Sequence, residues 1–255
     1  HRDLKPSNIY LRTLQARTEV KILDFGVAKV LGADLGLTMD GTESDHPRPT
    51  AHADSLTHRD YTRPEALATG AFWMFNLSFA FFALFSTAFT FHIISLGAEF
   101  GRGDDEILNY FIPMSLLGVG ANLFCGWVSS KTRLKYLLVG MNAAALAGVA
   151  GTLTLDTAWG ATAYVVGNGL CSGCFTALTG IVWPRFFGRR HLGAISGVGM
   201  STMVIASGIG PLVFSLSLAL AESYAPILWI SALFPALLLL GAWRLADNPQ
   251  RRHAP

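Results

Sequence analysis

The sequence has little charge. Only 14% of its 255 residues are Asp, Glu, Lys or Arg, whereas a soluble domain carries roughly 25%. The shortage is uneven: residues 66–255 hold ten basic and seven acidic residues, and residues 1–65 alone hold nine and ten. The net charge of +2 is too small to indicate a nucleic-acid partner. The composition therefore excludes an ordinary soluble domain over the last three quarters of the chain.

Cysteine is also scarce, with three residues in all. Cys171 and Cys174 form a C-x-x-C motif, which occurs in redox pairs and in half-sites for zinc. Both lie in an uncharged run with no second cysteine pair and no nearby histidine. We interpret them as small residues of a membrane helix and expect no metal site there.

Long apolar runs, by contrast, are abundant. After Glu65, six runs of 20 to 33 residues contain no Asp, Glu, Lys or Arg. A helix needs about 20 apolar residues to cross a hydrocarbon core about 30 Å thick. The runs do not alternate as barrel strands do, so they predict an all-α membrane protein with six transmembrane helices in a bundle. We interpret their many glycines as close helix contacts. The predicted spans centre near 72–95, 107–129, 136–155, 160–183, 194–219 and 224–243.

Basic residues alternate between the connections of these spans. Positive residues accumulate on the cytoplasmic side of membrane proteins. One set of connections and ends holds eleven Lys or Arg, and the other holds only Arg102. We therefore expect both ends of the membrane domain to be cytoplasmic and the acidic stretch 104–106 to lie outside. The eleven are Arg59, Arg63, Lys131, Arg133, Lys135, Arg185, Arg189, Arg190, Arg244, Arg251 and Arg252.

Three stretches of the apolar part carry a family resemblance. Residues 62–96, TRPEALATGAFWMFNLSFAFFALFSTAFTFHIISL, and residues 183–215, WPRFFGRRHLGAISGVGMSTMVIASGIGPLVFS, resemble the seventh and eleventh helices of major facilitator superfamily transporters. The branch they resemble is close to bacterial monocarboxylate and oxalate–formate carriers. The loop GWVSSKTRLK, residues 126–135, is similar to the short basic signature of that family. The matching positions are Gly126, Lys131, Arg133 and Lys135, and Ser130 stands where the family usually has an acidic residue.

The resemblance implies a function and a set of residues. It implies transport of a small solute, such as an organic anion, by two six-helix bundles that rock about a central site, with no cofactor. The lipid bilayer and a second six-helix half, or a second copy, are the expected partners. His92 could couple transport to protons, or it could bind a backbone carbonyl near the outer interface. The candidate path residues are Asn76, Ser78, His92, Asn122, Asn168, Ser172, Ser201 and Thr202.

The polar first quarter resembles a different family. HRDLKPSN at residues 1–8 and VKILDFG at residues 20–26 match the catalytic loop and the metal-binding turn of Ser/Thr protein kinases. The resemblance implies that Asp3 orients the substrate hydroxyl, that Lys5 steadies the phosphoryl group, and that Asn8 and Asp24 bind magnesium. The apolar residues around these motifs predict a short, partly ordered β-hairpin. Membrane helices follow where a kinase has its soluble lobe, so we expect no enzyme activity, and Mg-ATP binding only in a complete kinase.

These patterns divide the chain into four parts. We predict a truncated kinase fragment at 1–31, a linker or junction at 32–62, a six-helix membrane domain at 63–247 and a cytoplasmic tail at 248–255. Three hypotheses remain: a half-transporter with a kinase remnant, a membrane-linked kinase fragment, and a chimeric gene model that joins two genes. The A-P-E-like string at residues 63–66 fits the start of the transporter better than a kinase, because no kinase helices follow it.

Overall fold

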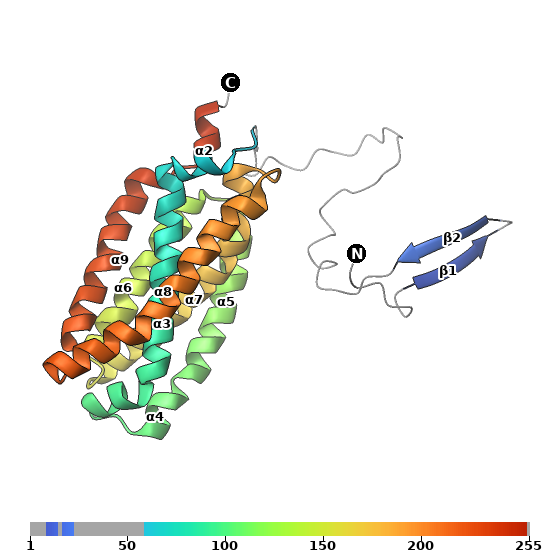
Figure 1. Cartoon of the computed structure of the whole chain (residues 1–255). Helices are drawn as coiled ribbons and strands as arrows, with labels where there is room; N and C mark the ends of the chain where they lie inside the picture. The colour runs from blue at the N-terminus through green and yellow to red at the C-terminus, as the bar shows by residue number, and fades with distance from the viewer. Residues whose placement is uncertain (1–8, 15–16, 23–58, 254–255) are drawn as a thin grey trace. The chain divides into compact units, whose positions relative to one another are not determined.

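The computed structural model describes residues 9–14, 17–22 and 59–253, which belong to two units that divide between Arg48 and Pro49 (Figure 1). The first unit contains β1 (Ile9–Leu14) and β2 (Arg17–Ile22), which pair antiparallel from Ile9 opposite Ile22 to Leu14 opposite Arg17. Two residues connect the strands, which is the shortest common hairpin connection. The strands lie where the sequence predicts a hairpin, and their assignment to a kinase stays a prediction.

Within residues 59–253, the second unit contains six helices that are long and apolar enough to cross a membrane. Each includes an 18-residue window with a mean hydropathy of 1.5 to 2.0. This confirms the six predicted spans. A short helix, α2 (Arg63–Leu67), precedes them, and a 3-10 helix, η3 (Pro249–His253), follows them. The spanning helices are α3 (Gly70–Glu99), α4 with α5 (Asp104–Asn109 and Phe111–Ser129), α6 (Leu134–Leu153), α7 (Ala158–Phe187), α8 (Leu192–Ala221) and α9 (Ala225–Leu245).

The second span differs from the single helix that the sequence predicts. It is interrupted at Tyr110, where α4 ends and α5 begins. Pro113 explains the break, because proline has no N–H to donate to the carbonyl four residues earlier, which belongs to Asn109. The acidic start of α4 therefore forms a separate turn beneath the apolar helix.

The helices pack as two parallel pairs joined by two further helices. α3 packs along α8, and both run from the end of the bundle that carries α2 to the opposite end (Figure 1). α5 packs along α7, and both run the other way. α6 packs against α7 and α9, and α9 also packs against α3. If α3, α5 and α6 exchange places with α7, α8 and α9, the α3–α8 pair becomes the α7–α5 pair and the α6–α7 pair becomes the α9–α3 pair. The bundle therefore has the helix pairing of an inverted repeat.

Burial separates the central helices from the peripheral ones. In the most apolar windows of α3, α6 and α7, 44% to 50% of the window is buried, whereas only 17% is buried in the spans of α5 and α8. Aromatic rings fill the core near the start of α3. Phe75 meets Phe186 edge to face with ring centroids 5.3 Å apart, and Phe72 lies 5.1 Å from Trp183. α5 and α8 therefore leave broad apolar faces open to whatever surrounds the bundle.

The two ends of the bundle differ in charge. All eleven basic residues of the alternating set belong to the segments at the end with α2 and η3, which we call the basic end. There the Gln250 side chain accepts from the backbone N–H of Arg59 at 3.1 Å and donates to the carbonyl of Phe186 at 3.1 Å. Asp60 accepts from the backbone N–H groups of Arg189 and Arg190 at 2.9 and 3.2 Å. These bonds hold the entry segment and the tail against the α7–α8 connection.

Candidate functional site

A polar groove lies between α3, α5 and α7. Ser86 and Thr90 of α3 face Asn168 and Ser172 of α7 across a hollow of about 50 Å³. Apolar and aromatic side chains form the rest of its wall. They are Phe82, Phe89, Phe111, Met114 and Tyr164. Ligand sites commonly combine such an apolar wall with a few placed polar groups.

The polar groups of the groove have local partners that leave acceptors free. The Asn168 amide donates to the carbonyl of Tyr164 at 3.0 Å, and the Ser172 hydroxyl donates to the carbonyl of Gly169 at 2.9 Å. The amide oxygen of Asn168 and the lone pairs of Ser172 remain available to a ligand. Gly148 of α6 makes room for this arrangement, because a Cβ there would lie 2.6 Å from the Asn168 amide nitrogen. The groove can therefore hydrogen-bond a small solute.

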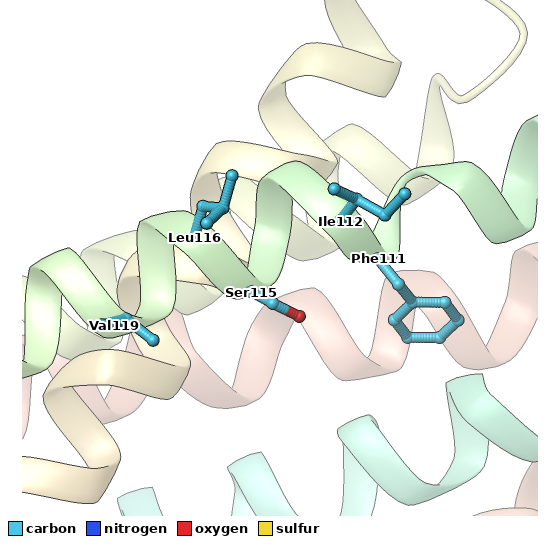
Figure 2. A pocket seen from close by; sticks show the side chains of 5 residues that line it. All are labelled: Phe111, Ile112, Ser115, Leu116 and Val119. Atoms are coloured by element: carbon cyan, nitrogen blue, oxygen red, sulfur yellow. The ribbon is translucent and has the colours of Figure 1, made fainter.

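Two further hollows adjoin the polar groove. One lies on the surface of α5, has a volume of about 390 Å³ and shares Phe111 with the groove. Figure 2 shows Phe111 projecting from one side of α5 and Ile112 and Leu116 from the other. The second, also of about 390 Å³, lies between α3, α7 and α8. Phe175 lines this hollow and Phe82 lines the groove, and their ring centroids are 4.5 Å apart.

Hydrogen bonds join α3 to α8 along one seam. The Asn76 amide donates to the Thr202 hydroxyl at 3.2 Å, and Thr87 and Ser207 share a hydrogen bond of 2.8 Å. Asn76 is fully buried, and its carbonyl oxygen is the one buried side-chain nitrogen or oxygen without a hydrogen-bond partner in the described part of the chain. Ser78 faces the opposite way and accepts from Asn142 of α6 at 3.0 Å. Asn76 and Ser78 therefore join helices rather than line the groove.

His92 lies at the junction of α3, α8 and α9. Its Nε2 is 3.1 Å from the carbonyl oxygen of Pro211, and its Nδ1 is 2.9 Å from the hydroxyl of Tyr224. Because a carbonyl only accepts, Nε2 donates to Pro211, and Nδ1 shares a hydrogen bond with the Tyr224 hydroxyl, which also lies 2.7 Å from the Ser95 hydroxyl. Both ring nitrogens thus have hydrogen-bond partners within the protein. This geometry matches the structural role that the sequence left open, and proton coupling through His92 stays a prediction.

Glu99 continues the same junction. Its carboxylate accepts from the Ser223 hydroxyl at 2.6 Å and from the backbone N–H of Tyr224 at 3.0 Å. Tyr224 is the N-cap residue of α9, where free N–H groups and the helix dipole favour a negative charge. Glu99 therefore fixes the start of α9 beside the end of α3.

The loop signature at the basic end forms structural contacts. The Lys131 ammonium lies 3.6 Å from the centroid of the Trp127 ring, and Lys135 pairs with Asp247 at 2.9 Å. Arg133 is the N-cap residue of α6, and Gly126 is exposed with no described atom within 4 Å of a would-be Cβ. These residues connect α5, α6 and the segment after α9.

Arg185 of α7 reaches the same loop from the other side. Its guanidinium donates to the carbonyl of Ser129 at 2.6 Å, at the end of α5. A cation there complements the negative end of the helix dipole and satisfies a terminal carbonyl. This bond couples α5 to α7 at the basic end.

The remaining sequence candidates lie away from the groove. Asn122 is half-buried on α5, where its backbone approaches Gly173 of α7. Ser201 is exposed on α8 and donates to the carbonyl of Gly197 at 2.9 Å. The kinase candidates Asp3, Lys5, Asn8 and Asp24 lie outside the described residues, so their geometry is not part of the site.

The cysteines meet across α5 and α7 rather than within the C-x-x-C motif. The Sγ atoms of Cys125 and Cys174 are 3.1 Å apart, and Cys171 is buried separately on α7. Within the described ranges, no group of three or more His, Cys, Asp or Glu side chains gathers as metal ligands would.

Sequence reasoning identified two of the four polar residues of the groove, Asn168 and Ser172, and missed Ser86 and Thr90. Ser and Thr are common in membrane helices, because their hydroxyls can bind carbonyls of the preceding turn, and so they do not stand out as path residues. Thr90, for example, donates to the carbonyl of Ser86 at 2.8 Å. A weak signal existed, because residues 82, 86 and 90 recur every four positions and so share one helix face.

Comparison with known proteins does not assign the chain to a family. The chain matches no protein-family model, and no curated protein matches it significantly.

Proposed function

We propose that the membrane domain is one six-helix half of a solute carrier, and that the groove between α3, α5 and α7 forms one wall of the transport path. The observation that carries this proposal is the meeting of Ser86, Thr90, Asn168 and Ser172 in a hollow on an otherwise apolar bundle. Polar groups inside membrane domains commonly mark substrate or ion pathways.

The pairing of the helices supports the proposal. Many transporters consist of inverted repeats, with the substrate site near the midplane where the repeats meet. Here the α3–α8 pair corresponds to the α7–α5 pair when the first and last three spans are exchanged. The groove lies between α3 and α7, the first helix of each set of three. The resemblance of residues 126–135 to the transporter loop signature also supports a solute carrier.

The chemistry of the groove limits what this half contributes. Its lining supplies hydroxyls, one amide and aromatic rings, and no Asp, Glu, Lys or Arg is among the lining residues. A small organic anion would need a cation from the opposing wall, because burying an unpaired charge is costly. A second six-helix half, or a second copy of this chain, would supply that wall.

Uptake of small solutes by the chain in proteoliposomes tests the proposal. We expect accumulation of labelled formate, oxalate or lactate, with kcat/KM reduced about fivefold by Asn168→Ala or Ser172→Ala, because each loses a hydrogen bond to the solute. Thr162→Ala is the matched control: Thr162 lies on the same helix, is exposed, and donates to the carbonyl of Ala158 at 2.9 Å. Equal losses in all three variants, or no uptake by the wild type with or without a partner half, would contradict the proposal.

For the N-terminal motifs we infer that this chain transfers no phosphoryl group. From Gly70 onward the residues after the DFG motif form membrane helices rather than a soluble lobe. Phosphoryl transfer depends on positioning by a complete enzyme. We expect no incorporation of labelled phosphate from ATP and Mg²⁺ into the chain or into a generic substrate protein. Incorporation that Asp24→Ala abolishes would reverse this inference.

A further inference from the structure

An apolar groove of about 860 Å³ runs along the outer surface between α6 and α9. α6 lines one side with Val139 and Ala143, and α9 lines the other with residues that include Leu239, Leu240, Trp243 and Arg244. Arg244 is the one charged residue of the lining. The groove lies on a different face from the polar groove of α3, α5 and α7, so it is independent of the proposed transport path.

Aromatic and basic side chains surround the end of this groove that lies at the basic end of the bundle. The Tyr136 and Trp243 rings have centroids 6.0 Å apart and are 46% and 59% exposed. The Lys135 ammonium lies 5.7 Å from the first centroid and 6.0 Å from the second. Amphipathic rings of this kind are enriched at the level of the lipid headgroups. The composition of this end of the groove, which we call its mouth, is therefore typical of the headgroup level of a membrane protein.

The charge of the mouth is positive and only partly neutralised. Lys135 is paired with Asp247 at 2.9 Å. Arg244 is exposed, and among the described residues its side chain makes no hydrogen bond or ion pair. A guanidinium binds phosphate with two parallel N–H donors, which makes arginine well suited to phosphate recognition. Basic pockets between membrane helices on the cytoplasmic side bind the headgroups of anionic lipids.

We propose that this groove binds one anionic phospholipid, with its acyl chains along Val139, Ala143 and Leu240 and its phosphate on Arg244. Apolar walls of this size suit acyl chains, and the free guanidinium at the mouth complements the negative headgroup. A zwitterionic lipid offers the same chains with no net charge and is held more weakly.

Native mass spectrometry of the purified chain, titrated with phosphatidylglycerol or phosphatidylcholine in mixed micelles, tests the charge. We expect one tightly retained phosphatidylglycerol and an affinity about fivefold lower in Arg244→Gln. Arg190→Gln is the control, because the substitution removes the same charge at the same end of the bundle. Arg190 is exposed and lies on the α7–α8 connection, outside the groove. Equal losses in the two variants, or equal affinity for both lipids in the wild type, would overturn the proposal in favour of general surface attraction.

A second pair of variants tests the groove itself. Ala143→Phe adds a ring to the lining of the groove, and we expect it to lose the retained phosphatidylglycerol while the folded chain keeps its charge. Ala147→Phe places the same ring one turn further along α6, on an exposed position outside the lining, and is expected to retain the lipid. Retention by Ala143→Phe at wild-type affinity would show that the lipid sits elsewhere. Circular dichroism of both variants verifies that each is folded.

Discussion

Replacing Gly167 with alanine is expected to lower the free energy of unfolding by about 3 kcal/mol, the upper part of the usual range for overpacking. A Cβ at Gly167 of α7 would lie 2.7 Å from the carbonyl oxygen of Ala144 and 2.7 Å from the Cα of Gly148, both backbone atoms of α6. Backbone atoms cannot rotate away as a side chain can, so the two helices must separate. Unfolding in mixed micelles with increasing sodium dodecyl sulfate, followed by circular dichroism, measures the loss.

Gly180→Ala is the matched control on the same helix. No atom of the described residues lies within 4 Å of a Cβ at Gly180, and alanine favours a helix over glycine by up to about 1 kcal/mol. We therefore expect this variant to be as stable as the wild type or slightly more stable. If the free energy of unfolding fell equally in both variants, Gly167 would not be required for the close contact of α6 with α7, and the packing of these two helices would need revision.

Labelling of engineered cysteines is expected to place the basic end inside the cell and the α4 end outside. Gly193→Cys lies at the start of α8 at the basic end, and Gly103→Cys lies just before α4. Both glycines are exposed, and in the part of the chain that the structure describes no atom lies within 4 Å of a would-be Cβ, so the two substitutions are sterically equivalent. The physical reason is the eleven basic residues at one end, which are retained on the cytoplasmic side during insertion.

In a variant with Cys125, Cys171 and Cys174 replaced by alanine, a membrane-impermeant maleimide should label Gly103→Cys in intact cells. Gly193→Cys should react at least about tenfold less until the cells are permeabilised. The permeabilised sample is the control for reactivity, since both cysteines should then label equally. The opposite pattern would invert the orientation, and extraction of the chain without detergent would contradict a membrane location altogether.

Much of the fold follows from local composition. A run of about 20 apolar residues must satisfy its backbone internally in lipid, and a helix is the simple way to do so. The six spans could therefore be read from the sequence. The interruption at Tyr110 could be explained by Pro113 but was not predicted, because membrane helices often tolerate proline. α8 contains Pro211 and continues to Ala221.

The groove was less predictable than the spans. Asn168 and Ser172 stood out as polar residues on an apolar helix, but so did Asn76, which the structure places in the α3–α8 seam beside Thr202. A polar residue in a span can face a neighbouring helix or a path, and its helical position alone does not distinguish the two. Whether a polar side chain faces a neighbouring helix or the path depends on which helix packs against which face of its own helix.

The sequence by itself determined the number of membrane helices, their approximate bounds and the separation of basic from acidic connections, because each depends on residues close together in the chain. Only the tertiary structure decided that Ser86 and Thr90 meet Asn168 and Ser172, that His92 contacts Tyr224, and that Arg244 ends an apolar groove. Each of these depends on how residues of different helices pack together. A Ser or Thr hydroxyl that binds a carbonyl of its own helix gives no sign in the sequence of which neighbouring helix it will face.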